Sequence, residues 1–150
     1  MNSGPAILGS LLAFVAGLSF VVQQGVNAAL RNEIGSPWWA GFVSYLGGTL
    51  AMLFMAILMR DPWPSANLIV KSNAISWSGG VFGAIYIAIS ILLLSKLGAT
   101  TVIGFIVAGQ LIGSILVDHF GLLGMSVHPF NPSRLAGAAM LVAGAVLVRA

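Results

Sequence analysis

Charged side chains are scarce in this chain of 150 residues. Six Lys or Arg and three Asp or Glu make up 6% of the sequence, against roughly 25% in an ordinary soluble domain. Apolar side chains make up 59%. A soluble globule of this size exposes much of its surface and cannot hide so many apolar groups. The composition therefore excludes a soluble domain and predicts an integral membrane protein.

Cysteine is absent, which excludes disulfides, thiolate nucleophiles and sulfur-ligated metals and leaves the redox compartment undefined. An adjacent Asp118 and His119, with a distant His128, match a metal site poorly. No serine has a base beside it in a recognisable catalytic arrangement. The net charge of +3 is spread along the chain, with no basic cluster to follow a nucleic-acid backbone. We expect no metal, no other cofactor, no enzymatic activity and no nucleic-acid partner.

Five long uncharged stretches separate the charged residues, and about 20 apolar residues are enough to cross a bilayer as a helix. The fifth stretch is the shortest and spans only if Arg134 and Arg149 extend toward the interface. We expect one all-α transmembrane domain over residues 1–150, with short connectors. Its helices are predicted at about 5–29, 37–59, 74–95, 98–119 and 133–149.

Tryptophan lies near the predicted ends of the second and third helices. Trp38 and Trp39 begin the second helix, while Trp63 and Trp77 precede or open the third on the opposite side. Tryptophan is enriched at membrane interfaces, so this placement indicates anchoring at both surfaces. A chance placement near helix ends is the alternative.

The positive charges are balanced across the predicted membrane. With five spans, one face receives Arg60, Lys71 and Arg134, and the other receives Arg31, Lys96 and Arg149. Orientation normally follows the face richer in Lys and Arg, so a tie predicts insertion in both orientations. Two oppositely oriented copies would form an inverted homodimer of ten helices, an architecture that many transporters build within one chain. A weak but fixed orientation is the alternative.

Carboxamides inside the predicted spans are the strongest candidates for a binding site. Gln23 and Asn27 are one helical turn apart on one face, whereas Gln24 points about 100° away, and Gln110 lies near the middle of the fourth helix. An unpaired carboxamide in hydrocarbon costs several kcal/mol, so each must face another helix or a wet cavity. Lining a cavity and holding helices together remain equally open for Asn27 and Gln110.

Hydroxyl and ionisable groups add weaker candidates. Tyr86 and Ser90, with Ser44 and Tyr45, are candidates to join a polar cavity, although lone hydroxyls in spans often bond their own backbone. Asp118 and His119 end the fourth helix, where a solvated helix end is a more ordinary role than ion coupling.

Three motifs of the chain are GSP at the start of the second helix, AGQL within the fourth and DHFGLLG at its end. Together with the stretches QQGVNAALRNEIGSPWWAGFVSYLGGTL, GGVFGAIYIAISILLLSKLGATTVIGFIVAGQLIGSILVDHFGLLG and RLAGAAMLVAGAVLVR, they resemble the YdcZ family of the drug/metabolite transporter superfamily. The resemblance runs over nearly the whole chain and implies a half-transporter of the bacterial inner membrane that pairs with an oppositely oriented copy or homologue. It implies Gln23, Asn27 and Gln110 as site positions.

The first predicted helix departs from related small multidrug exporters, which exchange protons for cations through a membrane-embedded glutamate on that helix. No carboxylate occurs between residues 5 and 29. Proton antiport of cationic drugs is therefore in doubt, and a neutral or zwitterionic solute or an uncoupled facilitator is at least as compatible with the chain.

Two classes of function follow from these features. The first is a secondary transporter that moves a small organic solute by alternating access within an antiparallel dimer in the lipid bilayer. The second is a structural or pore-forming, holin-like oligomer without a specific solute site.

Overall fold

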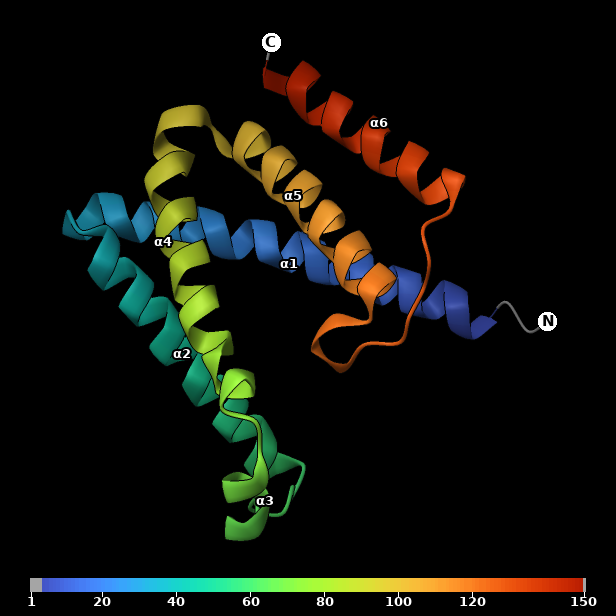
Figure 1. The fold of residues 1–150 in the computed structure, drawn as a ribbon. Coiled ribbons are helices and arrows are strands. Elements are labelled where there is room, and N and C mark those ends of the chain that lie inside the picture. The colour runs from blue at the N-terminus through green and yellow to red at the C-terminus, as the bar shows by residue number, and fades with distance from the viewer. Residues whose placement is uncertain (1–3, 150) are drawn as a thin grey trace. The chain divides into compact units, whose positions relative to one another are not determined.

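The computed structural model describes residues 4–149, and the regular structure of this range is entirely helical (Figure 1). The helices are α1 (Gly4–Ile34), α2 (Pro37–Leu58), α3 (Ala66–Lys71), η1 (Ala74–Ser78), α4 (Gly79–Leu97), α5 (Ala99–Phe120), η2 (Leu122–Gly124) and α6 (Pro132–Arg149). Five helices in this range are long and apolar enough to cross a membrane: α1, α2, η1 continued by α4, α5 and α6. The predicted all-α chain with five candidate spans is confirmed.

The ends of two helices differ from those expected. The 31 residues of α1 continue past Arg31 and Glu33, which gives a helix about 46 Å long against a bilayer core of about 30 Å. A helix of this length projects from the membrane or tilts within it. The α-helix of the third span begins at Gly79, because residues 74–78 form a 3-10 turn. A further short helix, α3, lies in the connector that precedes it.

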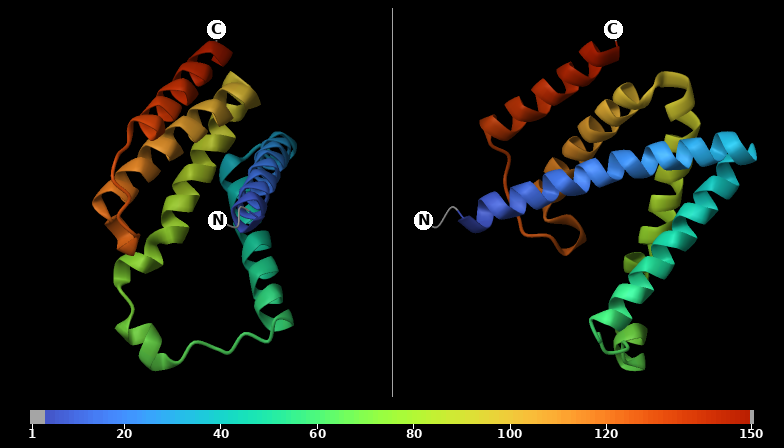
Figure 2. Two further views of the ribbon diagram at one scale, coloured as in Figure 1. Left: turned by 90° about the vertical axis from the view of Figure 1, so that its right-hand side faces the viewer. Right: turned by 180° about the vertical axis from the view of Figure 1, so that it is seen from behind.

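The GSP motif, residues 35–37, forms the turn between α1 and α2, and Figure 2 shows where these two helices meet. Gly35 takes a left-handed conformation with φ +71°, and its N–H donates to the Arg31 carbonyl at 2.9 Å, which closes α1. The Ser36 hydroxyl accepts from the Trp39 N–H at 3.3 Å and caps α2. Pro37 occupies the first turn, where its missing N–H has no partner to lose. Three consecutive residues therefore end one span and begin the next.

By their contacts the described helices form two compact units, which divide between residues 94 and 95 and are described separately. In the first unit, α1, α2 and α4 meet at a small apolar cluster. Its buried members are Ala40, Ile87 and Ile91, with Leu30, Tyr45 and Tyr86 packed around them. Three members of this cluster, Tyr45, Tyr86 and Ile87, also line a pocket among the same helices.

The second unit is an antiparallel pair, α5 and α6, which lie side by side (Figures 1 and 2). The two helices pack closely at Gly104, where an added Cβ would lie 3.4 Å from the Cβ of Ala145. Small residues at such a contact let two helix backbones pack closely in a membrane. At the other end of the pair, Nη1 of Arg134 lies 3.2 Å from Oδ2 of Asp118.

Gly121 is expected to be essential to the turn after α5, because it closes that helix with φ +61°. A Cβ there would also lie 2.7 Å from Cγ2 of Val127. We predict that Gly121→Ala lowers the free energy of unfolding of the detergent-solubilised protein by about 1–3 kcal/mol, as measured by chemical denaturation. Gly124→Ala separates the two causes, since Gly124 has φ +78° but open space around it. An unchanged stability for Gly121→Ala would contradict this account of the turn.

Candidate functional site

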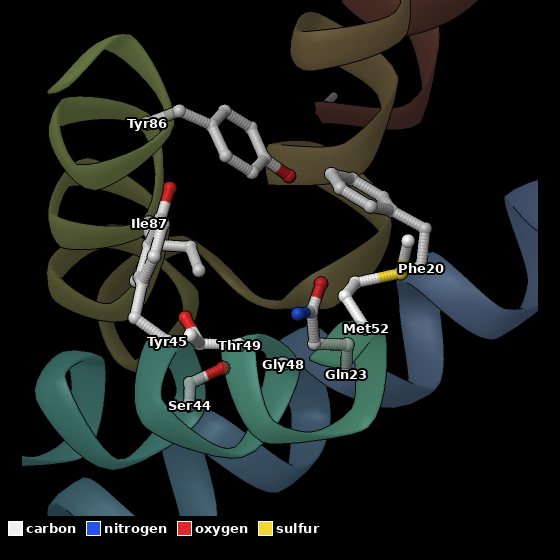
Figure 3. Close-up of a pocket in the computed structure, with 9 residues that line it drawn as sticks. All are labelled: Phe20, Gln23, Ser44, Tyr45, Gly48, Thr49, Met52, Tyr86 and Ile87. Atoms are coloured by element: carbon white, nitrogen blue, oxygen red, sulfur yellow. The ribbon is translucent and has the colours of Figure 1, made fainter. Parts of the chain in front are cut away.

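The first unit contains a pocket of about 560 Å³ among three candidate spanning helices (Figure 3). It is lined by Phe20 and Gln23 of α1, Ser44, Tyr45, Gly48, Thr49 and Met52 of α2, and Tyr86 and Ile87 of α4. Aromatic rings, hydroxyl groups and one carboxamide dominate this lining. None of these nine described side chains is charged. A largely apolar pocket with a few hydrogen-bonding groups is typical of a small-molecule site.

Two contacts with α1 hold Tyr86 in the pocket wall. Its ring stacks on that of Phe20, with the ring centroids 5.2 Å apart and the planes inclined by 27°. Its hydroxyl accepts a hydrogen bond from Nε2 of Gln24 at 3.0 Å. Since both partners come from α1, these contacts join α4 to α1 at the pocket. The hydroxyl of Tyr86 is thereby fixed relative to the pocket lining.

Two polar side-chain atoms of α1 are buried without a hydrogen-bond partner among the described residues. Gln24 is 0% exposed and Asn27 is 4% exposed. Oε1 of Gln24 accepts no hydrogen bond within residues 4–149, and Nδ2 of Asn27 donates none. Such groups are costly to leave unpaired, so each is expected to gain a partner from water, solute or another subunit.

The predicted site residues are distributed over both units. Gln23 and Tyr86 line the pocket, and the buried Ser90 donates from its hydroxyl to the Tyr86 carbonyl at 2.9 Å. Asn27 is buried in the same unit. Gln110 lies exposed on α5 in the second unit, as part of a different body of the chain. The structure therefore brings Gln23 and Tyr86 together around one pocket.

Gln24 holds the Tyr86 hydroxyl at the pocket wall, a role that its spacing along the helix did not predict. On a helix, Gln24 and Gln23 flank the direction of Asn27 by about 60° and about 40° on opposite sides. The neighbouring helices lie on the Gln24 side, so Gln24 is buried and Gln23 faces the pocket. Separations of three and four residues place Gln24 and Gln23 almost equally close to the direction of Asn27, so helical spacing does not choose between them. Nothing in the apolar sequence marked three other lining residues as part of a site: Phe20, Thr49 and Met52.

The end of α5 forms a second polar cluster, within the second unit. Asp118 pairs with Arg134 in a partly exposed salt bridge, whose expected contribution is at most about 1 kcal/mol. Nδ1 of His119 accepts from the Phe130 N–H at 3.2 Å, and the two rings stack with centroids 3.7 Å apart. These contacts attach residues 121–131 to the helix end. No three His, Cys, Asp or Glu side chains converge as metal ligands within the described residues.

The approach of Tyr45 to α4 requires a glycine. A Cβ at Gly83 would overlap the Tyr45 hydroxyl, so any side chain there must displace this ring from the pocket wall. We predict that Gly83→Ala destabilises the protein by about 1–3 kcal/mol and that adding Tyr45→Phe recovers part of the loss, both measured as free energies of unfolding. Gly80→Ala on the same helix meets open space and is the matched control. Strict additivity in this double-mutant cycle would contradict the contact.

Comparison with known proteins identifies the family. The family model described as "Putative inner membrane exporter, YdcZ" matches residues 8–147. Inner membrane protein YdcZ of Escherichia coli strain K12 is 31% identical over 142 residues, which cover 91% of this chain and 93% of that protein. No solved structure matches the chain. The family description is that of an exporter and names no enzymatic activity. The chain belongs to the YdcZ family of inner membrane proteins, the family that its sequence resembles.

Proposed function

We propose that this exporter-family protein is half of a secondary transporter for a small organic solute, and that the pocket among α1, α2 and α4 is part of the solute path. The observation that carries this proposal is the pocket itself. It lies among three candidate spans and presents Gln23, Thr49 and Tyr86 in surroundings where polar groups are otherwise rare. Polar groups at membrane depth are tolerated where they face other protein or line a cavity.

The complete transporter is proposed to be a pair of oppositely oriented chains, each a single five-helix domain, that exposes the site to the two sides in turn. The tie in positive charge supports dual insertion. Gln110 is exposed within the second unit, near the middle of α5, a candidate span, so its carboxamide needs a partner from outside that unit. Lipid cannot satisfy its carboxamide, whereas protein or a wet cavity can.

Uptake by reconstituted vesicles tests the proposal. Purified protein is expected to catalyse saturable uptake of a small organic solute. A second solute that binds the same site is expected to inhibit this uptake competitively. Phe20→Leu removes the ring that stacks on Tyr86 and is expected to lower this uptake at least tenfold, whereas Phe14→Leu, on the same helix but outside the pocket lining, is the matched control. An unsaturable leak of unrelated solutes, equal in both variants, would indicate a pore-forming oligomer instead.

A further inference from the structure

The pocket and its surroundings lack fixed charge. Along α1, Arg31 lies eight residues beyond Gln23, which is about 12 Å on a helix. Along α4, Lys96 lies ten residues beyond Tyr86, or about 15 Å. Charged side chains on the lining helices therefore stand two or more turns away along the helix, at the helix ends.

A second copy of the chain does not change this charge environment. Residues 1–30, 34–59, 72–95, 97–117 and 135–148 contain no Asp, Glu, Lys, Arg or His. Whatever face a partner copy presents at the middle of the membrane, its side chains there are uncharged as well. A charged solute would consequently leave water without meeting an opposite charge.

From this lining we infer that the transported solute is uncharged and combines an apolar or aromatic body with an amide or hydroxyl group. This inference rests on the proposed function and adds the substrate class. Phe20, Tyr45 and Met52 offer surfaces for the apolar body, while Gln23 and Thr49 offer both hydrogen-bond donors and acceptors. A volume of about 560 Å³ is ample for such a molecule.

A cation held by aromatic faces is the competing solute. Tyr86 has one ring face stacked on Phe20, which reduces the aromatic surface left for a cation. Attraction between a cation and the remaining faces is weaker than the loss of water around an ammonium group. An uncharged solute avoids this loss, and its passage through an uncharged site moves no net charge across the membrane. Its transport rate is therefore independent of membrane potential.

A matched series of probes tests the charge of the solute. N-acetylphenylalaninamide is uncharged, N-acetylphenylalanine is an anion, and phenylalaninamide is a cation at mildly acidic pH, where its amine is protonated. Uptake of each is measured in vesicles containing the full chain, after subtraction of the rate in protein-free vesicles. We expect saturable uptake of the uncharged probe to be at least tenfold faster than that of either charged probe, with no change when a potential is imposed.

Removing a single hydroxyl from the lining tests whether the uptake of the uncharged probe depends on the pocket. Thr49→Val removes a lining hydroxyl with little change in shape and is expected to reduce uptake of the uncharged probe about threefold, whereas Thr100→Val on α5 is the control. Faster saturable uptake of the cation or anion would overturn the inference and leave the proposed transporter in place. The absence of saturable uptake for every probe would overturn both. A potential-dependent rate for the uncharged probe would overturn the inference that transport moves no net charge, and would leave the uncharged solute class in place.

Discussion

Two added lysines in the connector near Asp61 are expected to force the chain into one orientation and to abolish transport when that variant is expressed alone. The unmodified chain has three positive residues on each predicted face, so a small addition decides the balance. Ser65→Lys and Asn67→Lys change exposed positions in and beside α3, without removing a described side-chain hydrogen bond. Reporters fused after Ala150 measure the orientation. In the unmodified chain we expect signal on both sides of the membrane.

The matched variant places its charges on the opposite predicted face. Asn32→Lys and Glu33→Lys, at exposed positions in the last turn of α1, are expected to favour the other orientation and to be equally inactive alone. Expressing the two variants together is expected to restore transport, because each supplies the orientation that the other lacks. A single orientation of the unmodified chain would exclude the homodimer and leave a pair with an oppositely oriented homologue.

The sequence predicts the spans well because exclusion of charge from hydrocarbon is a strong, local constraint. It predicts helix ends less well, since charge does not end a helix. α1 continues through Arg31 and Glu33 until Gly35, whose left-handed backbone stops it. The conformation of Gly35 and the cap from Ser36 decide the boundary.

The site shows a different limit of sequence reasoning. Spacing alone places Gln23 and Asn27 on one face of a helix, but Gln24 is nearly as close to Asn27 in direction. Only the position of α4, which brings Tyr86 within 3.0 Å of Gln24, shows which neighbour is buried. Tertiary contacts therefore assign roles that helical periodicity leaves equal.

The second large effect is expected at the carboxamides. We predict that Asn27→Leu and Gln110→Leu each reduce saturable transport roughly tenfold or more while the dimer stays intact. Leucine keeps apolar bulk and removes only the hydrogen bonds. Nδ2 of Asn27 has no partner among residues 4–149, so a solute or bridging water is a natural partner for it. Transport in vesicles and dimer content by cross-linking are measured on the same preparations.

Asp118→Asn is the comparison, because the Asp118–Arg134 salt bridge is partly exposed and its loss is expected to be tolerated. If the carboxamides only hold helices together, the leucine variants lose dimer in proportion to activity, since removing glue weakens assembly first. If Asp118→Asn instead stops transport while both leucine variants remain active, the carboxamide site is wrong. Asp118 and His119 would then be the coupling groups, and transport would depend on a charge at the end of α5 rather than on an uncharged site within the spans.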